Sequence, residues 1–461
     1  MSGTPPSEAP VDGEAIRKVV RETNYVTWRR QGDWNPLVVT RAEGSTFWDD
    51  RGRAYLDFSS QLMATNLGHS NPAVVAAIVA QAKQLSYAAP GFATEARARL
   101  SSALLEVLPA GLNRFFFSTS GTEANEAALK IARVATGRSK VLSRYRSYHG
   151  ATAASISVTG DPRRRPVEGL QTVPGTVFAP DCYCYRCPFG LTYPSCGVAC
   201  AEYVDLQLER EGDVAAMIVE PVVGTNGVLV PVPEYLPRIR EITRKHDVLL
   251  IADEVMSGWG RVGEWFAVDH WKVAPDILTT AKGITGAHIP LGLTATTTAL
   301  HEVFRDRYFP HGHTYEAHPL TLAPAVAAIG EYRRLDLLAK SRRDGEYLLR
   351  RLREIQEHHP SVGEVRGMGL FAAVELVRDR KSRLPFNTEE DKLAGRPLVA
   401  EKVAAAMMKE GVYCVAWVSH LVIAPPLIVT REELDRGLEV LDRALSLADA
   451  EVRPTPTAGP V

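Results

Sequence analysis

The stretch Pro275-Asp-Ile-Leu-Thr-Thr-Ala-Lys-Gly283 follows a similar one, Leu249-Leu-Ile-Ala-Asp-Glu-Val255. Each is a short apolar run typical of a buried strand, and each ends in polar residues. Because α/β sheets place ligands at the carboxyl ends of their strands, we expect Asp253 and Lys282 to lie at one sheet edge. A lysine there can form a Schiff base with an aldehyde, and a carboxylate can pair with a cationic ring nitrogen. Taken alone, the two residues are equally consistent with a surface ion pair.

A second motif predicts a phosphate site. The segment Ser118-Thr-Ser-Gly-Thr-Glu-Ala-Asn125 lies between a strand-like run and a helix expected over 126–136. Backbone N–H groups of Gly121 and Thr122, next to Ser120, would face outward at the positive end of that helix, as in anion sites. The alternative is that these residues only cap the helix.

A third motif, Tyr148-His149-Gly150, follows about one strand later. Its aromatic ring could stack on a flat ligand, although an isolated Tyr-His pair also occurs in ordinary packing. A phosphate site, a ring-stacking residue, a partner for a ring nitrogen and a lysine therefore occur in one chain. These are the groups that pyridoxal 5'-phosphate requires.

With these motifs the chain resembles the class III pyridoxal-phosphate-dependent aminotransferases, the group that includes ω-transaminases. Within the class, Arg144–Gly150, Thr159–Pro162 and Cys184–Cys196 resemble the taurine–pyruvate aminotransferase branch. The resemblance runs from about residue 30 to 450. Its other matching segments are Phe116–Asn125, Val219–Val222, Asp253–Val255, Gly258–Arg261, Ala281–Gly283, His311–Tyr315 and Ala424–Leu427.

The resemblance implies an α/β fold of the pyridoxal-phosphate fold type I, similar to aspartate aminotransferase. This fold has a large, mostly parallel-sheet domain, a smaller α+β domain and a homodimer with shared active sites. It also implies Lys282 and Asp253 as catalytic residues. The cofactor contacts would come from Ser120, Gly121, Thr122, Tyr148, His149, Glu220, Asp253, Val255, Lys282 and, reaching the phosphate of the neighbouring subunit, Thr314.

The substrate pocket departs from the family pattern. Many members carry a carboxylate-binding arginine in the segment that here reads Gly411-Val-Tyr-Cys-Val-Ala-Trp-Val-Ser-His420, which has none. Val415 or Trp417 takes its place. Either another cation binds the carboxylate, or the pocket favours bulky apolar amines. The candidate cations are Arg163, Arg164 and His420, and the resemblance places Leu62, Tyr87, Phe92 and Trp259 around the pocket, although such residues are as often plain core.

Five of the six cysteines lie close together. Cys184 and Cys187, with Cys196 and Cys200, have the spacing of a structural zinc site, and Cys182 is spare. An ordinary loop containing reduced thiols is the alternative. Disulfides are less expected, because we expect a cytoplasmic protein.

Composition supports that location. The 461 residues are 45% hydrophobic and 23% charged, with a net charge of −1. This near-neutral balance, with no basic run, gives no reason to expect a nucleic-acid partner. No stretch is long and apolar enough to cross a membrane, and the N-terminus does not resemble a secretory signal.

Strand-like and helical runs alternate up to about residue 338, which predicts a mainly parallel sheet covered on both faces. We expect a large cofactor-binding domain over 71–338 and a small α+β domain over 339–450. A segment over 16–70, with a hairpin within 38–58, would join the small domain. Residues 1–15 and 451–461 are expected to be disordered tails.

The sequence thus predicts an aminotransferase that moves an amino group from a taurine-like, ω-amino or bulky apolar amine to a keto acid such as pyruvate, by a ping-pong mechanism. Two alternatives remain open. One is a decarboxylase or aminomutase on the same fold, which would release carbon dioxide or need no second substrate. The other is a pyridoxal-phosphate-binding protein without catalytic activity.

Overall fold

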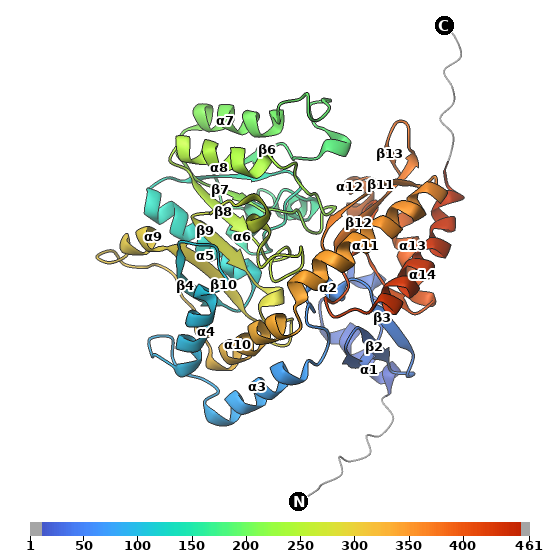
Figure 1. Cartoon of the computed structure of the whole chain (residues 1–461), viewed down its shortest axis with the longest axis horizontal. Coiled ribbons are helices and arrows are strands. Elements are labelled where there is room, and N and C mark those ends of the chain that lie inside the picture. Colours follow the sequence, from blue (N-terminus) through green and yellow to red (C-terminus); the bar gives the residue numbers. More distant parts are fainter. Residues whose placement is uncertain (1–11, 453–461) are drawn as a thin grey trace, which may run out of the picture.

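The computed structural model describes residues 12–452 and contains three β-sheets (Figure 1). In the largest sheet β10 is antiparallel to both of its neighbours, and the other strands run parallel to one another. The predicted, mostly parallel sheet is therefore confirmed. In spatial order its strands are β4 (Leu112–Ser118), β10 (Gly292–Thr297), β9 (Ile277–Thr280), β8 (Leu249–Asp253), β7 (Val214–Val219), β5 (Lys140–Arg144) and β6 (Thr176–Ala179).

Both faces of this sheet are covered by helices. Along β7, Ala216 and Ile218 belong to one buried cluster together with residues of α5 (Gly121–Thr136). Met217 and Val219 belong to another cluster, with residues of α7 (Ala199–Glu211) and α8 (Tyr235–Lys245). Because successive strand residues point to opposite faces, a strand buried on both sides must be apolar throughout. This explains the continuous apolar runs in the sequence.

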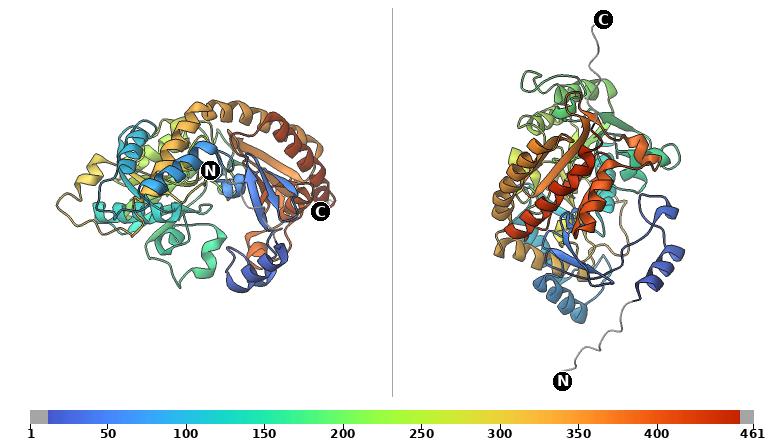
Figure 2. Two further views of the ribbon diagram at one scale, coloured as in Figure 1. Left: turned by 90° about the horizontal axis from the view of Figure 1, so that it is seen from below. Right: turned by 90° about the vertical axis from the view of Figure 1, so that its right-hand side faces the viewer.

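A set of longer helices connects the large sheet to the C-terminal part of the chain. Helix α10 (Pro319–Arg334) packs against α3 (Pro72–Gln84) and α4 (Glu95–Leu105). Helix α11 (Leu337–His358) then runs across to the second sheet, as both Figure 1 and the left view of Figure 2 show. Helix α11 thus joins the two parts of the molecule.

The second sheet is antiparallel and lies against α11 and two further helices, α13 (Val399–Lys409) and α14 (Arg431–Asp449). Thr430 and Glu433 form a capping box at the start of α14. The smaller α+β region expected after residue 338 is therefore present. In spatial order its strands are β11 (Val362–Met368), β12 (Phe371–Asp379), β16 (His420–Ile423) and β15 (Val415–Trp417), with β13 (Leu384–Pro385) paired to β12.

The third sheet ties the N-terminal segment to this C-terminal region. Its strands β1 (Val39–Glu43), β2 (Thr46–Asp49) and β3 (Ala54–Asp57) pair in order, and β3 lies parallel to β14 (Val412–Tyr413). These pairings form the hairpin expected within 38–58 and join it to a strand of the C-terminal part of the chain.

At the chain ends, helix α1 (Gly13–Thr23) begins within the stretch 1–15 that we assigned to a tail, because Asp12 caps its first turn. The rest of that stretch, residues 1–11, and residues 453–461 of the predicted C-terminal tail lie outside the described residues. Glu451 and Val452 are described, and their N–H groups bond to carbonyls of Ala448 and Asp449. The remaining short elements are α2 (Ser60–Met63), α6 (Ala153–Ser157), α9 (Thr298–Glu302), α12 (Glu389–Leu393), η1 (Gln31–Asp33), η2 (Pro162–Val167), η3 (Cys184–Arg186), η4 (Ala267–Trp271) and η5 (Lys282–Ile284).

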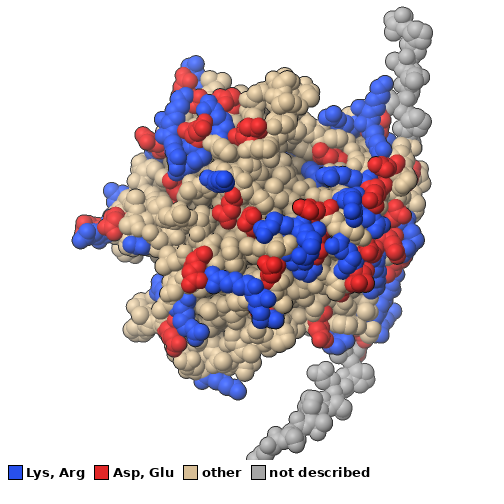
Figure 3. Space-filling model, in the orientation of Figure 1, with Lys and Arg blue, Asp and Glu red and all other residues tan. Residues whose placement is uncertain are grey.

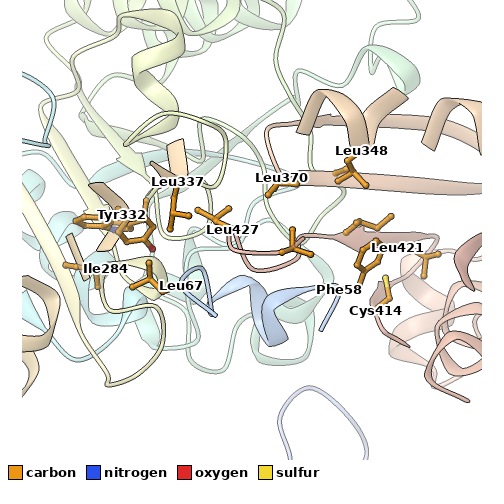
Figure 4. Packing of buried hydrophobic residues seen from close by; sticks show 14 of the residues in the cluster. Phe58, Leu67, Ile284, Tyr332, Leu337, Leu348, Leu370, Cys414, Leu421 and Leu427 are labelled. Carbon is orange, nitrogen blue, oxygen red and sulfur yellow. The ribbon is translucent and has the colours of Figure 1, made fainter. Parts of the chain in front are cut away.

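One hydrophobic core extends through both parts of the molecule. Figure 4 shows Ile284 and Tyr332 next to Leu337 and Leu427, and the packing continues to Leu421 in β16. Since this core is continuous, the two regions are held in a fixed relation by apolar burial. The domain limits at 70/71 and 338/339 remain predictions.

The surface carries charges of both signs. Figure 3 shows Lys and Arg interspersed with Asp and Glu over the C-terminal helices on the right-hand side of this face. Within residues 12–452 no helix has both the length and the apolar character needed to cross a membrane.

Candidate active site

The polar residues singled out by the sequence gather at the carboxyl edge of the large sheet. Asp253 is the last residue of β8, and Lys282 comes two residues after the end of β9. These strands are parallel neighbours, and Asp253 pairs with Thr279 in register. The prediction that Asp253 and Lys282 follow adjacent strands is therefore confirmed.

Asp253 is buried and accepts three hydrogen bonds. Its Oδ2 atom receives Nδ2 of Asn125 at 2.7 Å and Nδ1 of His149 at 2.8 Å, and its Oδ1 atom receives the backbone N–H of Val255 at 3.0 Å. Asn125 is itself fixed, because its Oδ1 atom accepts a bond from Thr279 at 2.6 Å. Asp253 is thus a rigidly held buried carboxylate.

His149 lies beside Asp253. Its Nδ1 atom bonds to the carboxylate, and its buried Nε2 atom has no hydrogen-bond partner among the described residues. In the tautomer that suits this arrangement Nδ1 carries the proton and Nε2 is bare. The sequence placed His149 among the cofactor contacts, and the structure adds that it orients Asp253.

The side-chain amine of Lys282 has a lowered pKa. Burial lowers the pKa of its amine from the ordinary value to about 8, and the nearby carboxylates of Asp253 and Glu220 oppose this decrease. Arg163, a like charge, adds to it. A lysine with a pKa near 8 is partly neutral at physiological pH and can accept a proton or act as a nucleophile. Its backbone has a φ of 44°, in the left-handed region that non-glycine residues seldom adopt.

The start of α5 has the geometry of an anion site. Ser120 is the N-cap, and its Oγ atom accepts the N–H of Glu123 at 3.2 Å. Gly121 and Thr122 are the first two helical residues, whose N–H groups cannot be satisfied inside a helix. A Cβ atom at Gly121 would meet the Val255 methyl groups at 2.9 Å, so the helix begins close against the residues that follow β8.

Glu220 fixes the loop that carries Tyr148. It is buried directly after β7, and its two carboxyl oxygens accept the N–H groups of Tyr148 at 2.9 Å and Gly224 at 2.8 Å. Burial raises the pKa of Glu220, while the imidazole of His149 and these N–H groups oppose the rise. Glu220 therefore orients the backbone of the loops at Tyr148 and Gly224, at this edge of the sheet.

Of the three candidate cations, Arg163 joins the site. Its guanidinium lies 3.8 Å from the ring centre of Tyr148, 4.5 Å from that of Trp417 and 5.5 Å from that of Trp28. Its Nε atom bonds to Oδ2 of Asp161 at 2.7 Å, and only 9% of the side chain is exposed. A largely buried arginine held in an aromatic cage is suited to bind a carboxylate or a sulfonate.

The other two candidates are engaged elsewhere. Arg164 pairs with Glu168 and covers the ring of Phe178. The ring of His420 bonds to the carbonyl of Thr225 at 2.8 Å, and burial lowers its pKa to about 4, so it is uncharged at neutral pH.

The residues placed around the substrate pocket do not form one cluster within the chain. Trp259 is fully buried, donates its indole N–H to Thr280 at 2.8 Å and packs in the core. We therefore leave it out of the proposed substrate contacts. Leu62 and Phe92 are 63% and 67% exposed. Tyr87, also exposed, donates its hydroxyl to the carbonyl of Thr314 at 3.2 Å.

The segment without an arginine forms β14 and β15. Val415 is partly buried and packs against an apolar cluster that includes Val222 and Met256. Trp417 is buried and stacks near Arg163. The position predicted for the carboxylate clamp is thus apolar, and the guanidinium that lies over Trp417 belongs to a different element, η2.

The cysteine segment forms a loop around η3. Cys182, Cys184, Cys187, Cys196 and Cys200 all line one small cavity of about 20 Å³, and all are free thiols. Among residues 12–452, no group of three or more His, Cys, Asp or Glu side chains is arranged to hold a metal ion. The tetrahedral zinc arrangement suggested by the spacing is therefore not formed in this structure.

Comparison with known proteins agrees with this site. The family model described as aminotransferase class-III matches residues 28–445. A leucine/methionine racemase of Thermococcus litoralis is 36% identical over 424 residues, which cover 90% of this chain and 91% of that protein. A taurine–pyruvate aminotransferase of Rhodobacter capsulatus is 33% identical over 427 residues, which cover 89% of this chain and 92% of that protein.

Solved structures show the same fold. The taurine:2-oxoglutarate aminotransferase of Bifidobacterium kashiwanohense, in complex with PLP and glutamate, superposes with a TM-score of 0.90 at 34% identity, covering 97% of this chain and all of that chain. An (S)-enantioselective ω-transaminase of Thermomicrobium roseum gives a TM-score of 0.89 at 34% identity, with 95% and 99% covered.

Proposed function

Because the chain belongs to the class III aminotransferases, it is a transaminase that uses pyridoxal 5'-phosphate, and we propose that Lys282 and Asp253 are its catalytic residues. The residues at the sheet edge fit this cofactor. They offer an amine, a buried carboxylate and a helix N-terminus suited to phosphate. When bound, the cofactor supplies a conjugated ring that accepts the electron pair released at the substrate carbon.

We propose the following roles for the protein groups. Lys282 holds the cofactor and, once released by the incoming amine, moves a proton at the substrate carbon, for which its lowered pKa is suited. Asp253 pairs with the protonated ring nitrogen and keeps it cationic. The phosphate would be bound by Ser120, Gly121 and Thr122, and the ring would contact Tyr148 and Val255.

We further propose that Arg163 binds the anionic group of the substrates. The donor would be a taurine-like or ω-amino compound, the acceptor a keto acid such as pyruvate, and the exchange ping-pong. The single observation that supports this substrate class is the largely buried Arg163 between Tyr148 and Trp417. Since the segment with Val415 and Trp417 has no guanidinium, bulky apolar substituents would be accepted on that side.

The test is a comparison of acceptors. We expect Arg163→Gln to raise the KM for pyruvate by about 10- to 100-fold, because a hydrogen bond to a charged group contributes about 1.5–3 kcal/mol. The KM for an uncharged aldehyde of similar size should change little. The matched control is Arg164→Gln, which removes the neighbouring charge. Equal KM values for pyruvate in the parent and in Arg163→Gln would contradict the assignment.

A second test of the role of Arg163 introduces an arginine at position 415. If Arg163 already supplies the positive charge, Val415→Arg should not improve pyruvate binding and should impair bulky apolar amines, because the new side chain fills apolar space next to Val222 and Met256. Michaelis constants for pyruvate and for a bulky amine measure both effects. A large decrease in the KM for pyruvate would instead indicate that the parent site lacks a carboxylate anchor.

We propose a homodimer with shared active sites. The support is that Thr314 and Tyr315 are exposed, together with Tyr87, Phe92 and Leu62. Exposed apolar residues in this number are typical of a surface that another chain covers. In this proposal Thr314 binds the phosphate of the neighbouring subunit.

Thr314→Ala should therefore weaken retention of the cofactor, and dilution to monomers should release it. Equilibrium dialysis of the pyridoxal phosphate, read at concentrations on both sides of the dimer dissociation, measures both effects. The control is Thr298→Ala, at a partly buried threonine that starts α9 and bonds to Asn113. A monomer that keeps its full complement of cofactor would contradict the shared site.

The acidity of Lys282 makes a prediction about pH. Only a neutral amine attacks an aldehyde, and a lowered pKa means that the neutral form appears as pH rises through about 8. The rate at which apoprotein captures pyridoxal phosphate, trapped by borohydride and followed by mass, should rise with pH and level off above that value. A rise that continues to the region of free lysine, about pH 10.4, would contradict the burial effect.

Alternative reactions of the same cofactor are separated by product analysis. A racemase is among the relatives, and racemisation needs no acceptor. We expect alanine to form from pyruvate only when an amine donor is present, with no carbon dioxide released. Inversion of the configuration of an amino acid in the absence of any keto acid would favour a racemase. Release of carbon dioxide would favour a decarboxylase. A cytoplasmic location remains a prediction from composition.

A further inference from the structure

The loop after β7 carries a buried asparagine with two partners. Asn226, 5% exposed, donates from Nδ2 to Oδ2 of Asp161 at 3.2 Å and accepts the indole N–H of Trp417 at Oδ1, at 3.0 Å. Asp161 holds the guanidinium of Arg163, and Trp417 covers that guanidinium. Asn226 therefore bonds to two of the groups that surround the guanidinium of Arg163, Asp161 and Trp417.

The same loop connects the two parts of the molecule. The carbonyl of Thr225 accepts a bond from His420 in β16, and the carbonyl of Gly227 accepts one from Arg366 in β11. Three successive loop residues are thus each bonded to a side chain of the C-terminal region. Of these three residues only Asn226 bonds to the C-terminal region through its side chain, and the backbone carbonyls of its two neighbours are held by His420 and Arg366.

We propose that Asn226 is a positioning residue that holds Arg163 in its aromatic cage and thereby sets the affinity for the anionic group of the substrate. This inference rests on the proposed role of Arg163. A primary amide is suited to the task because it donates to a carboxylate and accepts from an indole in the same plane, which neither an aspartate nor an apolar side chain can do.

Loss of the amide has a defined consequence. Without it, Oδ2 of Asp161 loses one donor and the buried indole N–H of Trp417 has no acceptor, so both groups gain freedom to move. Arg163 is held by Asp161 and stacked on Trp417, so its guanidinium would no longer be fixed. Asp253 is bonded to Asn125 and His149, and Lys282 lies just after β9. Neither depends on Asn226, so both would stay in place.

The experiment compares three variants by their KM and kcat values. Asn226→Leu should raise the KM for pyruvate about tenfold and leave the KM for the aldehyde acceptor and the kcat with it within about twofold, since about one hydrogen bond to a charged group is lost. Asn226→Asp, of the same size, keeps the acceptor for Trp417 but places a second carboxylate beside Asp161. Asn226→Asp should raise the KM for pyruvate as well, and it tests the positioning role if Asn226→Leu does not fold.

The control is Asn387→Leu. The Asn387 side chain also makes two amide hydrogen bonds, to the carbonyl of Pro397 and from the N–H of Val399, and neither partner holds Arg163. A purely structural loss should lower the melting temperature in both leucine variants. Only Asn226→Leu should raise the KM for pyruvate without raising the KM for the aldehyde.

A double variant shows whether Asn226 acts through Arg163. In Arg163→Gln the KM for pyruvate should already be high, and adding Asn226→Leu should raise it no further, since coupled residues are not additive. If Arg163→Gln raises this KM but neither change at position 226 does, the positioning role is wrong and Arg163 remains the anchor. If Arg163→Gln has no effect, both proposals are wrong.

Discussion

Replacing Lys282 with alanine is expected to abolish transamination and covalent retention of the cofactor. The loss should be at least about a hundredfold in kcat, the lower end of what a positioned acid–base group contributes. The physical reason is that Lys282 alone combines a place at the end of β9 with a pKa lowered to about 8. Turnover with an amine donor and pyruvate, together with mass analysis after borohydride treatment, measures both losses.

A control separates this effect from general damage. Lys245, at the end of α8, pairs with Asp205 on the surface, and Lys245→Ala should keep full activity. Turnover near the parent rate in Lys282→Ala, with the protein folded, would show that the lysine assignment is wrong.

Replacing Asp253 with asparagine is expected to slow turnover by roughly a hundredfold or more, on the scale seen when one buried electrostatic partner is removed. The variant should still fold, because the amide oxygen can take the place of Oδ2 and accept from both Asn125 and His149, while the NH₂ group then faces the backbone N–H of Val255.

The measurement is single-turnover kinetics of the donor half-reaction, with circular dichroism as the check on folding. Asp276→Asn is a suitable control, since Asp276 is also a paired carboxylate next to the sheet but bonds to Arg240 away from the site. Unchanged kinetics in Asp253→Asn with the cofactor bound would contradict the role of the carboxylate.

Much of this site could be predicted from local sequence, because its residues directly follow strands. A strand that is buried on both faces appears in the sequence as a continuous apolar run, and the residue after that run must lie at the carboxyl edge of the sheet. This is why Asp253, Lys282 and the start of α5 were located correctly. Helix α8 and strand β9 are likewise specified by local sequence, since one is amphipathic and the other is a short run with every residue buried.

The contacts that depend on tertiary packing could not be predicted. Arg163 and Arg164 are adjacent in sequence, and only the turn of η2 directs one into the site and the other toward Phe178. Trp28 lies far from both in sequence and reaches Tyr148 through the path of the N-terminal segment. Trp259 was expected at the pocket but lies in the core, because an aromatic residue has no local signal that distinguishes the two environments.

The cysteines show the same limit. Their spacing fits a zinc site, and they do gather around one small cavity, but the described side chains do not adopt a ligand arrangement. Spacing constrains which thiols can approach one another and leaves open where their sulfur atoms point.

The most direct test of the account identifies the residue that carries the cofactor. The parent enzyme, loaded with pyridoxal 5'-phosphate, is reduced with borohydride and digested, and the modified peptide is sequenced by mass spectrometry. The account predicts a single modified lysine, Lys282, and loss of the modification when an amine donor is added before reduction. Modification of another lysine, or retention of the label after the donor is added, would contradict it.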